Sequence, residues 1–232
     1  MSEYSVIVFC REPEPGKVKT RLSPVIPPVH AAYLYEALLS DAVDILLSLD
    51  EADKYLFHTP NESTFFDRYR SFGIKVVPQG EGDLGERIAR AMRSVLERGR
   101  GPAVVVGSDI PLLTADIIRQ AVSLLSRHDV VVGPSRDGGY YLIAASSFHP
   151  GLFSEIPWST EIVLEETLKK CRSLNLSWTL LGELQDIDRP EDLLSFVEEL
   201  RSGSFPEPVR RRRFSRAAEG LYPYLLRLLR GR

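Results

Sequence analysis

Short apolar runs alternate with helical patterns along most of this chain, and this alternation limits the folds that it can adopt. Residues 103–106 are apolar at every position, which is typical of a strand buried on both faces of a parallel sheet. The alternation predicts the α/β class, with a mostly parallel central sheet and helices on both faces. We expect strands at residues 6–9, 55–57, 74–77, 103–106, 130–132, 140–143 and 178–181, and helices at about 29–49, 83–96, 114–126, 159–174 and 190–200.

The composition of the chain indicates the cellular compartment in which the protein is expected. The 232 residues include only two cysteines, Cys10 and Cys171, which lie far apart in the sequence, so neither a disulfide framework nor a zinc cluster is expected. No segment reaches the ~18 continuous apolar residues of a membrane span. The apolar run at residues 4–9 is too short for a signal peptide. We therefore expect a cytoplasmic protein.

Charge is distributed unevenly between a main domain, expected at residues 1–203, and a basic C-terminal extension, expected at 204–232. The extension holds eight arginines and two glutamates, a net charge of +6, so the rest of the chain carries −9 of the total of −3. An acidic domain does not suit nucleic-acid binding, which needs a basic footprint, but it suits carboxylates that hold a metal ion. We expect the extension to pack on the domain or on a second copy in a homodimer. The alternative is contact with an anionic membrane surface.

A cationic loop follows the first expected strand. Arg11, Lys17, Lys19 and Arg21 lie on a segment that also contains Gly16. Ligands of open α/β sheets bind beyond the carboxyl ends of the strands, so these cations are well placed to hold phosphates. The segment is not a Walker A loop, because valine follows Gly16 and Lys17 where that motif requires Ser or Thr. A solvated basic loop is the alternative.

Two groups of carboxylates follow later segments. Asp109 comes directly after the most apolar strand, where it could hold Mg²⁺ together with waters and phosphate oxygens; an Asx turn or an internal ion pair is the alternative. Asp186 and Asp188 point to the same side of an extended segment and could face the same metal ion. Equally, Asp188 and Glu191 have the spacing of a capping box at the start of a helix.

Residues 80–85 (GEGDLG) match the G-x-G-x-x-G pattern of dinucleotide sites. Glu81 and Asp83 would place negative charge where a pyrophosphate should bind, so a dinucleotide-dependent oxidoreductase is not favoured. The alternative is a glycine-rich turn with Asp83 as the N-cap of the next helix.

Two further segments could shape a pocket for an acceptor. Gly138 and Gly139 would let the backbone approach a ligand closely, although a hairpin turn explains them too. Residues 157–160 (PWST) precede an expected helix that Ser159 or Thr160 would cap. Trp158 could stack on a base or a sugar, or belong to the core.

Six motifs in this order resemble those of a known family. They are residues 15–22 (PGKVKTRL), 80–87 (GEGDLGER), 107–111 (GSDIP), 133–141 (GPSRDGGYY), 157–160 (PWST) and 186–192 (DIDRPED). Over about residues 4–200 the chain resembles the DUF2064 family, glycosyltransferase-like proteins associated with arsenosugar biosynthesis and also called selenodomain-associated transferases. It is more distantly similar to 2-phospholactate guanylyltransferase, molybdenum-cofactor guanylyltransferase and the sugar-nucleotide cytidylyltransferases.

The resemblance implies the GT-A fold of the nucleotide-diphospho-sugar transferases. It gives the phosphate-loop role to Lys17, Lys19 and Arg21, the first metal position to Asp109 and the second to Asp188. This sequence departs from the family pattern at Ile110, where a small residue or Cys is frequent, and at Arg189, where a Thr N-cap is usual. The second departure bears on the direction in which Asp188 points.

The resulting hypothesis is a transferase that uses Mg²⁺ or Mn²⁺, a nucleotide sugar or nucleoside triphosphate as donor, and a small-molecule acceptor. The resemblance favours glycosyl transfer. Nucleotidyl transfer with release of pyrophosphate and a non-catalytic nucleotide-binding module stay open. We expect Asp109, Lys19 and Arg21 to be catalytic, and Asp109 and Asp188 to bind the metal ion. We expect Arg11, Gly16, Lys17, Lys19, Arg21, Gly82, Asp83 and Gly85 to bind the nucleotide, and Asp137, Gly138, Gly139, Tyr140, Trp158, Ser159 and Thr160 to bind the acceptor or sugar.

Overall fold

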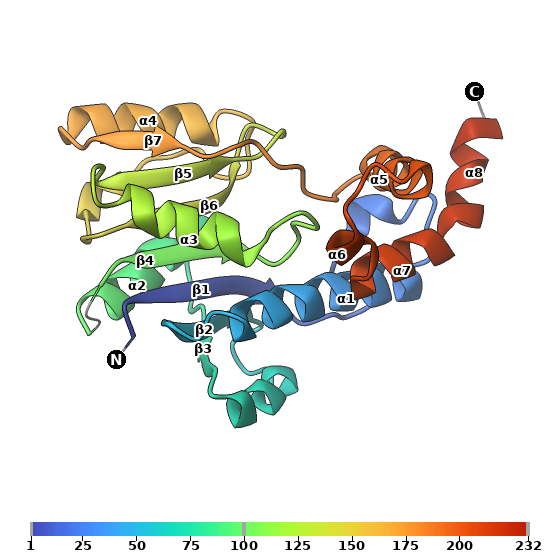
Figure 1. The fold of residues 1–232 in the computed structure, drawn as a ribbon, viewed down its shortest axis with the longest axis horizontal. Helices are drawn as coiled ribbons and strands as arrows, with labels where there is room; N and C mark the ends of the chain where they lie inside the picture. The colour runs from blue at the N-terminus through green and yellow to red at the C-terminus, as the bar shows by residue number, and fades with distance from the viewer. Residues whose placement is uncertain (1, 99–100, 231–232) are drawn as a thin grey trace.

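A seven-stranded sheet forms the centre of the molecule (Figure 1). The computed structural model describes residues 2–98 and 101–230. The strands lie in the order β3-β2-β1-β4-β6-β5-β7; β6 is antiparallel to both neighbours and the other pairings are parallel. The sheet confirms the predicted α/β class. The strands are β1 (Tyr4–Arg11), β2 (Ala52–Thr59), β3 (Lys75–Pro78), β4 (Ala103–Gly107), β5 (Val130–Pro134), β6 (Tyr140–Ala145) and β7 (Trp178–Leu180).

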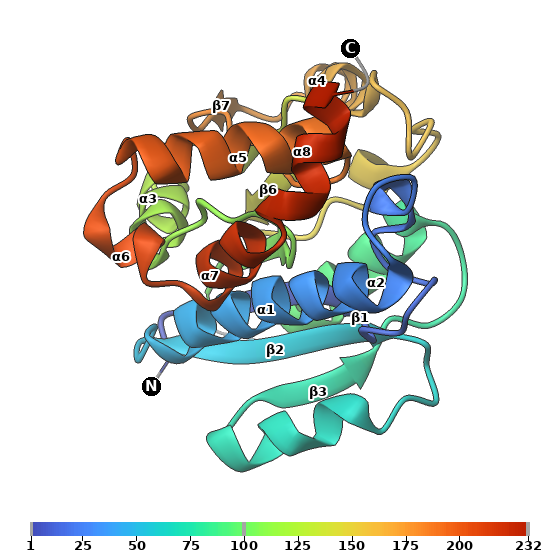
Figure 2. The ribbon, with the colours of Figure 1, turned by 90° about the vertical axis from the view of Figure 1, so that its right-hand side faces the viewer.

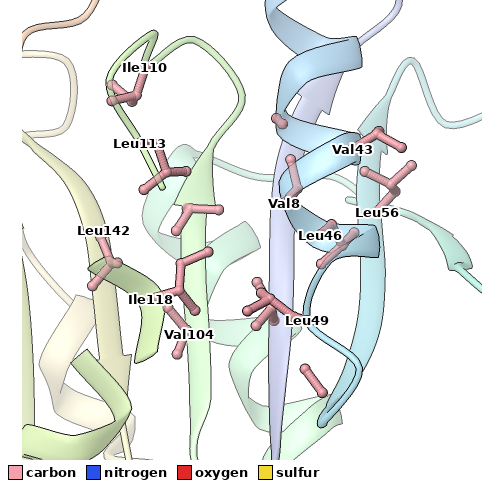
Figure 3. Close-up of a cluster of buried hydrophobic side chains, with 14 of the residues drawn as sticks. Val8, Val43, Leu46, Leu49, Leu56, Val104, Ile110, Leu113, Ile118 and Leu142 are labelled. Carbon is pink, nitrogen blue, oxygen red and sulfur yellow. The ribbon is translucent and has the colours of Figure 1, made fainter. Parts of the chain in front are cut away.

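Helices cover both faces of the sheet, as the sequence predicts. On one face, apolar residues of α1 and α3 share a core with Val6 and Val8 of β1; on the other, residues of α2 and α4 share a core with Ile7. Figure 3 shows Val43 and Leu46 of α1 beside the strand residues of the first face. The helices are α1 (Pro28–Leu47), α2 (Leu84–Leu96), α3 (Ala115–Leu124), α4 (Val163–Ser173), α5 (Pro190–Ser202), α6 (Glu207–Arg210), α7 (Arg213–Gly220) and α8 (Tyr222–Arg230), with short 3₁₀ turns η1 (Thr20–Leu22), η2 (Phe65–Phe72) and η3 (Pro150–Phe153).

The register of the sheet brings the chemistry-bearing loops to one edge. Phe9 of β1 pairs with Gly107 of β4, so the two strands end side by side. Strand β6 runs in the opposite direction, and its first residue, Tyr140, pairs with Pro134 at the end of β5. The loops that follow β1, β4 and β5 therefore leave the sheet at the same edge, which is where ligands bind in this fold class.

Two helix starts confirm the capping predictions and one does not. The Asp83 carboxylate accepts the backbone N–H of Glu86 at the start of α2, and the Thr114 hydroxyl accepts that of Ile117 at the start of α3. The expected cap of α4 by Ser159 or Thr160 is wrong, because α4 begins only at Val163 and has no side-chain cap. The Thr160 hydroxyl instead donates to the carbonyl of Pro157, which closes a local turn.

The C-terminal extension packs on α1 and α5 (Figure 2). The segment around residues 206–213, which sequence composition suggests is a linker, instead forms α6 and the start of α7. Phe214 is fully buried, and its ring centroid lies 5.0 Å from that of Phe196 in α5. Leu221 and Leu225 are buried in the same cluster, as expected for packing on the domain. No helix within residues 2–98 and 101–230 is long and apolar enough to cross a membrane.

Phe214→Ala is expected to lower the free energy of unfolding by about 3–5 kcal/mol, because it leaves a cavity between α1, α5 and α7. Urea denaturation followed by circular dichroism measures the change. The matched control is Phe72→Ala, whose side chain is 61% exposed and which should change stability by less than about 0.5 kcal/mol. Equal effects of the two substitutions would show that the extension does not contribute to the folded core.

Candidate functional site

A cavity of about 890 Å³ lies at the edge where the strands end. Its inner wall is apolar and aromatic, formed by side chains such as Phe9, Ile88 and Trp158. Its rim is charged, because three arginines and six carboxylates line it. Carboxylates therefore outnumber cations two to one in the lining. The charged residues are Arg21, Arg136, Arg189, Asp109, Asp137, Glu161, Asp186, Asp188 and Asp192.

Asp109 lies at the centre of this rim and forms an ion pair with Lys19. The two atoms Lys19 Nζ and Asp109 Oδ2 are 3.0 Å apart, and the Lys19 side chain is only 5% exposed. Burial raises the pKa of Asp109, but the charge and hydrogen bond of Lys19, with a smaller contribution from Arg11, outweigh that effect and hold the pKa below its ordinary value. Asp109 is therefore ionised and fixed at the cavity. The structure thus places the cationic loop beside Asp109 and contains the internal ion pair that the sequence left open for this carboxylate.

Tyr35 of α1 ties together the ends of β1 and β4. Its hydroxyl accepts the backbone N–H of Arg11 at 2.8 Å and lies 2.8 Å from the hydroxyl of Ser108. Arg11 and Ser108 flank the two loops that carry Lys19 and Asp109. One buried tyrosine thus fixes the spacing between the start of the cationic loop and the start of the Asp109 loop.

Asp188 is the second carboxylate predicted to bind metal, and it pairs with Arg21. Its backbone is held by Asp192, whose carboxylate accepts the N–H groups of Asp188 at 3.2 Å and Arg189 at 2.7 Å. The helix start is thus capped by Asp192, not by the predicted pairing of Asp188 with Glu191. Capping by Asp192 leaves the Asp188 side chain facing the cavity.

Asp186 also lines the cavity, although it is absent from the set of site residues expected above. Burial and the nearby charges of Asp109 and Asp137 raise its pKa to about 6. The Ser135 hydroxyl is its hydrogen-bond donor, at a long 3.5 Å. The sequence signal that could have identified Asp186 is its alternation with Asp188 in an extended segment, because this alternation places both side chains on one side.

The donor set suits a hard divalent cation that also binds substrate. Within the described residues, no three His, Cys, Asp or Glu side chains are arranged to hold a metal ion by themselves. Mg²⁺ commonly takes one or two carboxylates and completes its shell with waters and phosphate oxygens. Asp109 and Asp188 offer such oxygens at the cavity.

The cationic loop divides into two parts in the structure. Arg21 lines the cavity, and the Lys19 side chain reaches the carboxylate of Asp109, which also lines it. Arg11, Gly16 and Lys17 are not among the lining residues. Lys17 is exposed and pairs with Glu14 at 2.6 Å. Lys19 adopts a left-handed backbone conformation, with φ of 48°, and its side chain turns inward to Asp109.

The three expected nucleotide-binding residues of the glycine-rich segment, Gly82, Asp83 and Gly85, do not line the cavity either. Backbone conformation and close packing account for the glycines: Gly82 has a φ of 104°, which favours glycine, and Gly85 is packed against Trp158. A Cβ atom on Gly82 would lie 2.2 Å from the Glu86 carboxylate, and one on Gly85 would lie 2.1 Å from the Trp158 indole nitrogen. The neighbouring Leu84 faces the cavity instead. Gly85 thus lets Trp158 approach α2 and form the apolar wall.

Most of the expected acceptor residues line the same cavity, in a part that we call the acceptor wall. Asp137, Gly139, Tyr140, Trp158, Ser159 and Thr160 all line the cavity. Gly138 does not line the cavity, but it connects the turn before β6 with the segment before α4. Its carbonyl accepts the N–H of Leu164 at 2.9 Å, and a Cβ atom on Gly138 would meet the carbonyl oxygen of Glu161. The rings of Tyr140 and Trp158 are in edge contact, with centroids 6.2 Å apart.

Comparisons with known proteins agree with this geometry. A family model described as an uncharacterized protein conserved in bacteria (DUF2064) matches residues 42–160. A solved protein from Desulfovibrio desulfuricans G20, described as a nucleotide-diphospho-sugar transferase, is 30% identical, covers 98% of both chains and superposes with a TM-score of 0.87. A 2-phospho-L-lactate guanylyltransferase from Methanocaldococcus vulcanius is 24% identical, over 77% of this chain and 78% of that protein. The resemblance stated from the motifs is confirmed.

A more distant structure shares the fold alone. Glucosyl-3-phosphoglycerate synthase from Mycobacterium tuberculosis, solved with Mn²⁺, uridine diphosphate and glucosyl-3-phosphoglycerate, is 15% identical and superposes with a TM-score of 0.51. The match covers 88% of this chain and 81% of that protein.

Lys19→Met is expected to raise the pKa of Asp109 above its ordinary value, because burial remains while the cation that opposes it is removed. A ¹³C NMR titration of the aspartate carboxyls, with Asp109 assigned from Asp109→Asn, measures the shift. Lys17→Met is the matched control and should leave the Asp109 titration unchanged. A low pKa of Asp109 in the Lys19→Met protein would contradict the ion-pair argument.

Proposed function

Because the chain belongs to the DUF2064 family, we propose that it is a metal-assisted transferase that moves a group from a nucleotide donor to a small acceptor bound in the cavity. The carrying observation is the Lys19–Asp109 pair beside Asp188 and Arg21, where two carboxylates and two cations meet at the ends of the strands. Phosphates carry several negative charges and need both kinds of partner. Cations bind them directly, and carboxylates bind them through a divalent cation.

Asp109 and Asp188 would hold the cation, Mg²⁺ or Mn²⁺, on the side of the cavity that faces the cationic loop. When bound, the cation supplies neutralisation of the charge that develops on the leaving group. Arg21 lines the cavity and is exposed enough to exchange its Asp188 partner for a phosphate oxygen. Lys19 stays buried and keeps Asp109 ionised and aimed.

We propose glycosyl transfer to a neutral, hydroxyl-bearing acceptor as the reaction. The support is the charge of the acceptor wall, where Asp137, Glu161 and Asp186 line the cavity against Arg136 and Arg189 on that side. Three carboxylates face two arginines there, so a neutral acceptor is favoured over one with phosphate or carboxylate groups. A sugar or polyol would meet carboxylates as hydrogen-bond acceptors and Trp158 as an apolar surface.

Nucleotidyl transfer is the second candidate, and a different observation favours it. Lys19 and Arg21 bring two cations of one loop to the carboxylates at the cavity, and cations beside a metal ion suit the phosphates of a nucleoside triphosphate. The curated relatives, including the protein from Methanocaldococcus vulcanius, are 2-phospho-L-lactate guanylyltransferases. The two reactions differ in their leaving group, which is a nucleoside diphosphate in the first and pyrophosphate in the second.

Incubation with Mn²⁺, neutral and phosphorylated acceptors, and panels of nucleotide sugars and nucleoside triphosphates is expected to release a nucleoside diphosphate with a neutral acceptor. Anion-exchange chromatography and a pyrophosphate assay identify the product. Pyrophosphate release that depends on a phosphorylated acceptor would instead establish nucleotidyl transfer. Metal-dependent nucleotide binding without any product would indicate a non-catalytic module.

Asp109→Asn is expected to lower turnover by about 100-fold or more, because it removes the charge that holds the cation against the phosphates. Isothermal titration of a nucleotide in the presence of Mn²⁺ should show weaker binding, and the difference should shrink when the metal is chelated. The control is Asp116→Asn, whose side chain is 92% exposed on α3. Unchanged Mn²⁺-dependent binding in Asp109→Asn would remove the basis of the proposal.

A further inference from the structure

An arginine from the C-terminal extension holds the loop that carries Asp109. Arg212 lies directly before α7, about a hundred residues away in the sequence, and its guanidinium donates to two backbone carbonyls of that loop. Nη1 donates to the carbonyl of Pro111, and Nη2 donates to that of Leu113 at 2.7 Å. The planar fork of arginine suits two acceptors at a fixed separation, which a lysine cannot match.

The base of this arginine is itself fixed. The Asp41 carboxylate of α1 accepts the backbone N–H groups of Arg213 at 3.0 Å and Phe214 at 2.9 Å, and so caps α7 from another helix. Phe214 is fully buried, and the Ser215 hydroxyl donates to the Val209 carbonyl at 2.7 Å. The guanidinium therefore projects from a rigid start of α7.

The loop after β4 is held on both sides of Asp109. Before it, the Ser108 hydroxyl bonds to Tyr35 of α1. After it, Ile110 and Leu113 are buried in the core, as Figure 3 shows, and the carbonyls near them bind Arg212. Both Tyr35 and Asp41 belong to α1, so this helix connects the contact that holds Ser108 with the contact that holds the start of α7 and Arg212.

We propose that Arg212 is a positioning residue, which fixes residues 108–113 so that Asp109 points into the cavity, and that the C-terminal extension is required for the reaction through this contact. The inference rests on the proposed function of Asp109. If Arg212 had a purely structural role, it would only attach the extension to the domain. Its loss would then lower the stability of the protein without changing the conformation of the loop that carries Asp109.

The test compares Arg212→Met with Arg213→Met in the full-length protein. Methionine keeps an apolar stem and removes the guanidinium. Arg213 is half exposed and pairs with Asp44 rather than with the loop, so its variant controls for the loss of one arginine at the start of α7. Arg212→Lys retains the charge without the fork, and it is the second variant should Arg212→Met fail to fold.

Arg212→Met is expected to speed amide hydrogen exchange in residues 108–114, to weaken Mn²⁺-dependent nucleotide binding, and to lower kcat/KM by about 10- to 100-fold, the loss typical of a misplaced catalytic group. Arg212→Lys should fall between Arg212→Met and the wild type. Arg213→Met should match the wild type in all three measurements.

Two outcomes separate the inference from the proposed function. Wild-type exchange in residues 108–114 and wild-type nucleotide affinity in a folded Arg212 variant, with only the melting temperature lowered, would overturn the inference. Absence of Mn²⁺-dependent nucleotide binding by the wild-type protein would overturn the proposed function. In that event, unchanged amide hydrogen exchange in the Arg212 variants would still overturn the inference that Arg212 fixes residues 108–113.

Discussion

The ion pair between Lys19 and Asp109 is the interaction on which the arrangement of the site depends. A buried ammonium group is costly without a partner, so the inward turn of the Lys19 side chain requires a carboxylate at the end of β4. The parallel register of β1 and β4 supplies that carboxylate by ending both strands at the same edge. The pair in turn holds the cationic loop against the cavity, although most of that loop is exposed. Sheet topology thus determines where the charges of Lys19 and Asp109 meet.

Helix α1 holds the ends of β1 and β4 and the start of α7 in fixed positions. Its apolar side packs on β1 and β2, while Tyr35 reaches the ends of β1 and β4 and Asp41 reaches the start of α7. Burial raises the pKa of Asp41, and the two backbone N–H groups that it accepts oppose that effect. A carboxylate held in this way gains hydrogen bonds that compensate for part of its desolvation. The extension is therefore attached at the same helix that sets the spacing of the active loops.

Sequence patterns predict the parts of this structure that depend on local chemistry. The apolar runs give the strands, and Asp83 and Thr114 give two helix starts because an N-cap needs only its own next turn. The meeting of Lys19 with Asp109 is also predictable, since both follow neighbouring strand ends. Contacts between distant segments are different. At the start of α4, for example, the backbone N–H of Leu164 donates to the carbonyl of Gly138 in the turn before β6. No local pattern contains that information.

The glycines of residues 80–85 show why a motif needs its surroundings before it indicates a ligand. Gly82 is required by its backbone conformation, with φ of 104°, and Gly85 by the indole of Trp158, which packs against it. The same glycine that resembles part of a dinucleotide fingerprint therefore shapes the apolar wall of the cavity. Carboxylates exceed arginines in the lining of that cavity, and Arg21 of the loop after β1 is one of its three arginines. Proteins of one fold can differ in the group that they transfer because the cavity is lined from several segments. Here β5, β6 and the segment before α4 contribute lining residues that do not belong to the Lys19–Asp109 pair.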